Sequence, residues 1–248
     1  IYNEPGELSY KLIWFILLLL APPVGMILWF LWGGAAQKRH LPQNGKRVPD
    51  EPESVRKRSA LAVERLTRQF PGWSRTANYL CRRDFQLYQD TRVTYLPEGA
   101  LLLRELIEQA KKAERFIFLE YFILAEGRLW SELEKILCAK AHEGVEVKII
   151  FDDFGNIKRF RGETIDRLRD AGVEVFIFNP VHEYVNRLYF NYRDHRKIAC
   201  FDGDVAYTGG VNIADEYANL IERFGYWKDS GVRLEGEGAW GLTASFIH

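Results

Sequence analysis

The feature that most restricts the fold of this chain is a regular alternation of helical and apolar segments between residues 98 and 178. The helical segments are amphipathic, whereas the segments between them are continuously apolar, which is typical of strands buried on both faces of a sheet. The order predicts an α/β fold with a mainly parallel or mixed sheet flanked by helices, extended by a strand at 227–234. The predicted helices are 98–114, 128–143 and 162–171, and the predicted strands are 116–123, 145–151 and 173–178.

Polar residues stand where these predicted strands end. Asp152 and Asp153 follow the second strand, and Asn179 follows the third. Ligands in open α/β sheets bind at the carboxyl ends of strands, although at least one of the two aspartates is expected to cap a loop. Glu120 lies inside an otherwise apolar strand, and two explanations stay open. Either it supports a site by pairing with a histidine or lysine, or it faces water at a sheet edge.

A short motif, His195-Arg-Lys197 with Asp202 five positions further on, points to chemistry. Side chains alternate along a strand, so His195 and Lys197 project from the same face. An imidazole beside an ammonium suits phosphoryl transfer, because one group can attack phosphorus while the other holds the phosphate oxygens. The alternative is a surface hairpin that carries a histidine and a lysine without a function.

The residues after the motif predict a hairpin that returns to the same place. Asp202-Gly203 is a turn signal between a strand at 197–201 and a strand at 204–208. The turn Gly209-Gly210-Val-Asn212 then follows. It is expected to bring the Gly210 backbone N–H and the Asn212 side chain to one anion beside the His-Lys strand.

Residues 12–36 contain no charged side chain, and as one helix they would be about 37 Å long. This exceeds a hydrocarbon core of about 30 Å, so a single membrane span is expected. Trp14 near one end and Trp29 and Trp32 near the other fit interfacial belts. A buried core helix is the alternative, and Pro22-Pro23 leaves a kink or a hairpin open. More basic residues follow the stretch than precede it, which predicts that the bulk of the chain is cytoplasmic.

The segment between the apolar stretch and the predicted sheet is polar and basic. Residues 37–53 contain three prolines and read as a linker, and 54–70 predict an amphipathic helix with a basic face. That helix either packs on the domain or lies on an anionic leaflet. The resulting organisation is a membrane anchor at 1–36, a linker with amphipathic helices at 37–97 and a catalytic half at 98–248.

The composition excludes several classes of function. The chain has 34 basic and 34 acidic side chains, so its net charge is zero and a nucleic-acid partner is not expected. Its three cysteines suit a reducing compartment. The cysteines and the five histidines show no metal-ligand spacing, so we expect no metal and no cofactor.

The motif and its glycine turn resemble the signature of the phospholipase D superfamily. In combination with the apolar N-terminal stretch, the ordered motifs resemble those of bacterial cardiolipin synthases over most of the chain. The motifs that carry this resemblance are Glu120-Tyr121, Asp152-Asp153-Phe-Gly155, Phe178-Asn179-Pro180, Gly209-Gly210-Val-Asn212-Ile-Ala-Asp215-Glu216-Tyr217 and Trp227-Lys-Asp229.

The resemblance implies a role for each motif residue. His195 would be the nucleophile that forms a phosphohistidine, and Lys197, Asn212 and Gly210 would bind the phosphate oxygens. Asp202 would fix the motif geometry or partner a catalytic group. The implied reaction transfers a phosphatidyl group from one phosphatidylglycerol to the glycerol hydroxyl of another and releases glycerol. Its implied place is the cytoplasmic side of the bacterial inner membrane.

Two departures from the family pattern matter. The family carries two such motifs and usually two N-terminal membrane helices, whereas this chain shows one motif and one apolar span. We expect that it corresponds to the N-terminal portion with the first motif. The general acid would then come from a missing C-terminal half or from a second chain. The alternatives are a membrane-bound phosphodiesterase that hydrolyses, a nuclease that acts as a dimer, and a scaffold without chemistry.

Overall fold

The structure is a computed structural model that describes residues 8–29, 53–82, 85–160, 162–180, 193–223 and 225–247. The chain divides into two units. The larger unit contains residues 50–180 and 193–248, and the smaller contains residues 1–49 and 181–192.

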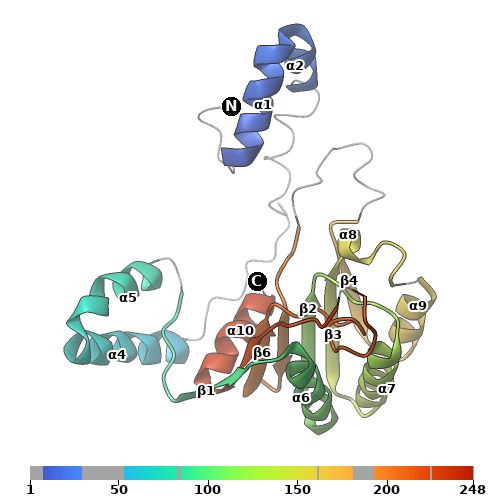
Figure 1. The fold of residues 1–248 in the computed structure, drawn as a ribbon. Helices are drawn as coiled ribbons and strands as arrows, with labels where there is room; N and C mark the ends of the chain where they lie inside the picture. Colours follow the sequence, from blue (N-terminus) through green and yellow to red (C-terminus); the bar gives the residue numbers. More distant parts are fainter. Residues whose placement is uncertain are drawn as a thin grey trace. The chain divides into compact units, whose positions relative to one another are not determined.

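A seven-stranded mixed sheet lies at the centre of the larger unit, in the order β1-β7-β6-β5-β2-β3-β4 (Figure 1). β2, β3 and β4 run parallel, and the remaining neighbours pair antiparallel. The sheet is therefore mixed rather than mainly parallel. The strands are β1 (Thr91–Leu96), β2 (Phe116–Tyr121), β3 (Glu146–Asp152), β4 (Glu174–Phe178), β5 (Ile198–Phe201), β6 (Val205–Gly209) and β7 (Gly231–Gly236).

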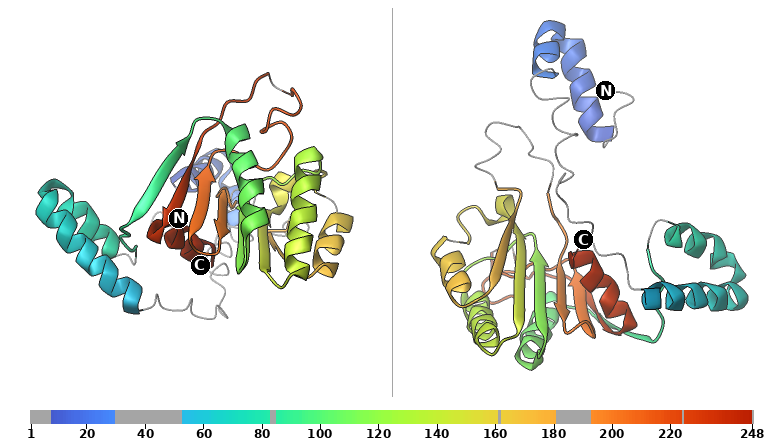
Figure 2. Two further views of the ribbon diagram at one scale, coloured as in Figure 1. Left: turned by 90° about the horizontal axis from the view of Figure 1, so that it is seen from below. Right: turned by 180° about the vertical axis from the view of Figure 1, so that it is seen from behind.

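Helices cover both faces of this sheet (Figure 2). The larger core lies under α6 (Gly99–Lys112), α7 (Arg128–His142) and α9 (Gly162–Asp170). The smaller core lies under α10 (Glu237–Ile247) and contains Phe118, Cys200 and Phe246. The short helix α8 (Asp153–Asn156) directly follows β3. β2 contributes residues to both cores, which explains why it reads as an almost continuous apolar run in the sequence.

The predicted helices and strands between residues 98 and 178 are confirmed to within two residues, and so is the predicted hairpin of β5 and β6. The sheet nevertheless begins before the expected boundary at residue 98, because β1 pairs with β7 along its whole length. β1 is an edge strand with exposed residues, so it lacks the apolar run that identifies the buried strands.

A helical hairpin precedes β1. It consists of α4 (Glu53–Gln69), the 3₁₀ turn η2 (Pro71–Trp73) and α5 (Ser74–Cys81). The Oγ of Ser59 accepts a hydrogen bond from the Leu87 N–H at 2.8 Å, which ties α4 to the domain. The amphipathic helix predicted at 54–70 is confirmed, and its buried stripe is small. Phe70 and Trp73 at the turn are exposed.

In the smaller unit, the chain doubles back instead of continuing as one helix. α1 (Leu8–Leu20) ends before Pro22-Pro23, and α2 (Pro22–Leu28) follows it. The rings of Trp14 and Trp29 lie 5.2 Å apart, whereas the same residues in one straight helix would be about 22 Å apart. A Cβ on Gly25 would lie 3.0 Å from the Leu17 carbonyl oxygen, so glycine is needed where the helices touch.

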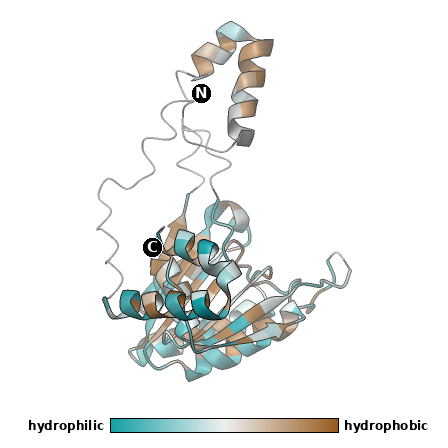
Figure 3. Cartoon of the chain, turned by 90° about the vertical axis from the view of Figure 1, so that its left-hand side faces the viewer, coloured by the Kyte–Doolittle hydropathy of each residue, from teal (hydrophilic) through white to brown (hydrophobic). Residues whose placement is uncertain are grey.

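In the part that the structure describes, two helices replace the single span expected over 12–36, because two consecutive prolines interrupt the helical hydrogen bonding. This is the hairpin that Pro22-Pro23 left open. Of the helices in the described ranges, none has the length and apolar character needed to cross a membrane. Most of α1 and α2 is hydrophobic (Figure 3), and Leu19 and Leu20 are about four-fifths exposed. Trp32 and the predicted linker at 37–52 lie outside the described residues.

Candidate active site

The candidate site lies along the edge of the sheet that is formed by strand ends, where the ends of the five central strands lie side by side. β2 and β3 end at this edge. β5 runs antiparallel to β2 and begins there, β6 ends there, and β7 begins there. The residues just outside these ends therefore meet although they are far apart in the sequence. They include Phe122 after β2, Asp152 at the end of β3, Lys197 before β5, Asn212 after β6 and Asp229 before β7.

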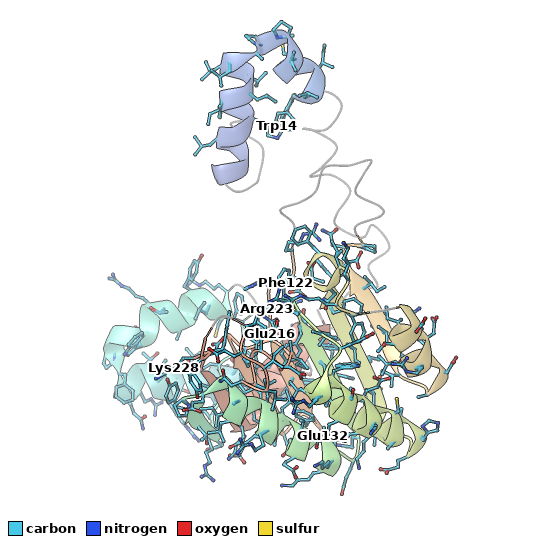
Figure 4. All side chains as sticks on the ribbon, turned by 45° about the vertical axis from the view of Figure 1, so that its right-hand side comes forward. Trp14, Phe122, Glu132, Glu216, Arg223 and Lys228 are labelled. Carbon is cyan, nitrogen blue, oxygen red and sulfur yellow. The ribbon has the colours of Figure 1, made fainter. Side chains whose placement is uncertain are left out.

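His195 and Lys197 both lie beside the ring of Phe122, which is labelled in Figure 4. The His195 and Phe122 ring centroids are 5.0 Å apart, and the Lys197 Nζ is 5.5 Å from the Phe122 centroid. Nζ also donates a 2.8 Å hydrogen bond to the His195 carbonyl oxygen. His195 is exposed, whereas Lys197 is buried. The imidazole and the ammonium thus share one surface, as strand alternation predicts.

The surroundings of these two groups set their protonation. Burial lowers the pKa of Lys197 to about 8, although the nearby carboxylates of Asp194 and Asp229 act in the opposite direction. Burial and the Lys197 ammonium lower the pKa of His195, against the opposing effect of Asp194 and Asp152. At neutral pH the pair therefore combines a neutral imidazole with a charged ammonium, which suits a nucleophile beside an oxyanion ligand.

Asn212 is oriented by the backbone of the neighbouring strand end. Its Oδ1 accepts a 3.0 Å hydrogen bond from the Ile123 N–H, and its side chain is buried. This contact leaves the amide nitrogen as the end that can donate to an anion, as expected for a phosphate ligand. Beyond Asn212, Asp215 accepts from the Arg128 and Leu129 N–H groups at the start of α7.

The expected phosphate contact from Gly210 is wrong, because its N–H donates to the Ser230 carbonyl oxygen at 3.2 Å. A Cβ at this position would overlap the Asp229 carboxylate. Gly210 therefore allows the close approach of Asp229, a residue that acts electrostatically on Lys197. The sequence contains Asp229 in the Trp227-Lys-Asp229 motif, but nothing in that motif indicates its proximity to Lys197.

Asp202 does not lie in the site. It follows β5 at the opposite edge of the sheet, five strand positions and so about 16 Å from Lys197. Its carboxylate accepts hydrogen bonds from the N–H groups of Glu114 (3.0 Å), Arg115 (2.7 Å) and Phe116 (2.9 Å). Partial burial acts to raise the pKa of Asp202, but these donors outweigh it and lower the pKa. A catalytic role for Asp202 is ruled out by this distance, and the structure shows that it fixes the hairpin to the start of β2.

Glu120 also lies away from the His-Lys pair. It is fully buried in β2 opposite Ile198, on the sheet face that α10 covers, whereas Lys197 faces the other way. Neither explanation considered for Glu120 is correct, because it is not at a water-facing edge and does not contact His195 or Lys197. Its carboxylate instead lies 2.5 Å from Nη2 of Arg196, the central residue of the motif.

Asp152 and Asp194 hold the segment that leads into the motif. The Asp152 carboxylate accepts from the Phe154 N–H at 2.9 Å, and it thereby caps the short helix α8, whereas a loop cap was expected for one of the two aspartates. It also accepts from Arg193 Nη1 at 3.2 Å and from the Asp194 N–H at 3.0 Å. The predicted site residue Asn179 contributes its carbonyl oxygen, 3.5 Å from Arg193.

In the described part of the chain, no group of three or more histidine, cysteine or acidic residues is arranged to hold a metal ion. The positive charge beside His195 that the structure shows is the Lys197 ammonium. The chemistry available from these residues is nucleophilic attack by an imidazole on an electrophile whose negative charge is held by Lys197 and the Asn212 amide.

Comparison with known proteins gives two matches to protein families. Residues 103–222 match the model described as "Cardiolipin synthase, PLD-like domain". Residues 1–34 match the model described as "Phospholipase_D-nuclease N-terminal".

The chain is also similar to individual proteins. An uncharacterized protein of Streptococcus mutans is 48% identical over 172 residues, which are 69% of this chain and 37% of that protein. The major cardiolipin synthase ClsA of Bacillus subtilis is 31% identical over 253 residues, which cover all of this chain and 52% of the synthase. Among solved structures, phosphatidylserine synthase of Haemophilus influenzae gives a TM-score of 0.49 at 18% identity, over 62% of this chain and 35% of that one. The chain spans about half the length of the cardiolipin synthases that it matches.

Proposed function

The chain belongs to the cardiolipin synthase family with phospholipase D-like domains, and we propose on this premise that it makes cardiolipin from two molecules of phosphatidylglycerol. One observation carries the proposal: His195 and Lys197 lie against Phe122, and Asn212, 17 positions after His195, is bonded to the next residue, Ile123. An exposed imidazole beside a buried ammonium is not needed to stabilise the sheet, whereas phosphodiester chemistry uses both groups.

In the first proposed step, a ring nitrogen of His195 attacks the phosphorus of phosphatidylglycerol. An N–P bond forms, the bond between phosphorus and the glycerol oxygen breaks, and glycerol leaves with a proton from a general acid. The Lys197 ammonium and the Asn212 amide hold the phosphate oxygens as charge develops on them. The lowered pKa of His195 supports this step, because a neutral imidazole is the nucleophilic form.

In the second proposed step, the glycerol hydroxyl of another phosphatidylglycerol attacks the phosphohistidine. The N–P bond breaks, cardiolipin forms, and the group that acted as acid accepts the hydroxyl proton. We expect a second His-x-Lys motif to supply this group, either elsewhere in the protein or from a second chain.

The proposed place of the reaction is the cytoplasmic side of the bacterial inner membrane. The apolar surface of α1 and α2 and the match of residues 1–34 to the N-terminal family support membrane association. The basic residues that follow the apolar stretch support the sidedness.

The test incubates the complete protein with phosphatidylglycerol vesicles and identifies the products by lipid mass spectrometry. We expect cardiolipin and free glycerol in equal amounts, and loss of both with His195→Ala. His142→Ala is the matched control, because His142 is exposed on α7 far along the sequence from the motif. Unchanged turnover in His195→Ala would refute the proposal and favour the scaffold.

The same assay separates the alternatives. Phosphatidic acid without cardiolipin would indicate a hydrolase, since water would then replace the second phosphatidylglycerol. Cleavage of DNA by the complete protein, with no change in the lipid, would indicate the dimeric nuclease.

A further inference from the structure

The residues that carry His195 are not held by the sheet. The ladder between β5 and its neighbours begins at Ile198, which pairs with Glu120 and Thr208. Residues 193–197 therefore lack the regular inter-strand hydrogen bonds that fix the residues after them. Side-chain contacts must hold this segment, and those contacts set the positions of His195 and Lys197.

Arg196 makes the largest set of these contacts. Its Nη1 donates to the Ser245 carbonyl oxygen at 2.8 Å and to the Ser245 Oγ at 3.2 Å. Its Nη2 lies 2.5 Å from Oε1 of Glu120, and its Nε donates to Oδ1 of Asp194 at 3.3 Å. One planar guanidinium thus joins β2, the motif segment and α10. Ser245 lies in the last turn of α10, where carbonyl groups attract a cation.

Side chains alternate in direction along residues 194–197, so the contacts of Arg196 and the two candidate reactive groups lie on opposite sides of the segment. His195 and Lys197 lie beside Phe122, whereas Arg196 and Asp194 lie with Glu120 on the side of α10. Arg196 stands between the two site residues in the sequence and points away from both. Fixing its guanidinium therefore fixes the backbone from which the imidazole and the ammonium project.

The charge balance of the cluster explains how Glu120 and Asp194 tolerate burial beside the half-exposed Arg196 side chain. Burial, reinforced by the neighbouring Asp194, raises the pKa of Glu120 to about 9, in spite of the Arg196 guanidinium. Glu120 is therefore protonated at neutral pH. The Asp194 carboxylate then faces the Arg196 guanidinium, and the cluster has no excess charge.

We propose that Arg196, held by Glu120, Asp194 and the carboxyl end of α10, is a positioning residue that orients His195 and Lys197 for reaction. The inference rests on the proposed function for its kinetic consequence, but its structural consequence is independent of it. Arg196 does not touch the substrate in this arrangement, so its loss changes the rate of the chemical step and not the binding of lipid.

The test measures kcat and KM for phosphatidylglycerol in the complete protein, together with the imidazole NMR signals of His195. Arg196→Met is expected to lower kcat by about 10- to 100-fold, because a displacement of about 1 Å can cost about 100-fold. KM is expected to stay within about twofold, and the His195 signals are expected to shift. Arg196→Lys is expected not to restore kcat, because one ammonium cannot reach all three partners.

Two further variants separate positioning from general loss of structure. Glu120→Gln keeps the shape and the neutral form of the side chain, so it should retain kcat to within about threefold. Arg167→Met removes a comparable ion pair, with Glu134 at 2.9 Å between α9 and α7, and should leave kcat and the His195 signals unchanged.

The outcomes are distinguishable. A wild-type kcat in folded Arg196→Met with unshifted His195 signals would overturn the inference. If the complete protein shows no lipid turnover at all, the proposed function fails, and the His195 signals alone then decide whether Arg196 positions the motif.

Discussion

Replacing Lys197 by methionine should stabilise the fold while it removes activity. Lys197 is buried, and its pKa falls from the ordinary 10.5 to about 8. One pKa unit corresponds to about 1.4 kcal/mol, so holding the charge in the folded protein costs at most about 3.5 kcal/mol. The site is open to water beside the exposed His195, and water screens part of this cost. We therefore expect Lys197→Met to raise the free energy of unfolding by between about 1 and 3 kcal/mol.

The direction of this stability difference follows from the protonation equilibria of Lys197 in the folded and unfolded states. The folded protein releases the Lys197 proton near pH 8, whereas the unfolded chain releases it near pH 10.5. The unfavourable contribution is therefore complete below pH 8 and is relieved as the pH rises from 8 to 10.5. At pH 7, Lys197→Met should have the larger free energy of unfolding, and the difference should vanish by about pH 11.

The assay is urea unfolding of wild type and variant, followed by circular dichroism between pH 7 and pH 11. Lys135→Met is the matched control, because Lys135 is exposed on α7, and its difference from wild type should not depend on pH in this way. If Lys197→Met is less stable than wild type at pH 7, the folded protein holds the ammonium favourably. The expected cost of burying the Lys197 charge would then be refuted. Lipid turnover by Lys197→Met should fall at least about 100-fold, as for a lost oxyanion ligand.

Three further predictions concern the motif. Asp202→Asn should lower the free energy of unfolding by roughly 1–3 kcal/mol, because one acceptor for backbone N–H groups is lost, and kcat measured on folded protein should not change. Gly210→Ala should lower kcat, because the added Cβ displaces the Asp229 carboxylate, and unchanged kinetics would contradict the close approach of Asp229 to Gly210. The rate of lipid turnover should rise as His195 loses its proton below pH 6.5 and fall as Lys197 loses its proton near pH 8. A pH–rate profile without the alkaline fall would argue against a charged Lys197 in the reaction.

The sequence predicted the parts of the fold that depend on local pattern. The apolar strands β2, β3 and β4 and the helices between them appear as predicted, because the residues that they bury in the core leave a strong signal in the sequence. The pairing of β1 with β7 could not be predicted from pattern, since it joins an exposed edge strand to a segment 135 or more residues away. The N-terminal stretch was predicted as one span because hydropathy outweighed the two prolines, whereas the backbone geometry of Pro22-Pro23 decided the structure.

The candidate site divides in the same way. Strand alternation placed His195 and Lys197 together, and the glycine turn placed Asn212 near them. The sequence did not show that the Gly210 N–H is bonded to the Ser230 carbonyl oxygen or that Asp202 lies at the opposite ends of the strands. Both depend on contacts between distant segments. The contact between Glu120 and Arg196 was missed for the same reason, since it joins β2 to the segment that precedes β5.

The alternation between residues 194 and 197 has a consequence for how this stretch can vary. Two side chains, His195 and Lys197, point to the side of Phe122, and two, Asp194 and Arg196, point to the side of Glu120. Inserting or deleting a single residue would exchange the two sets. An aspartate and an arginine would then stand at the mouth of the site, and the imidazole would be driven under α10. Among homologous chains, the count of residues from Asp194 to Ile198 should therefore be invariant.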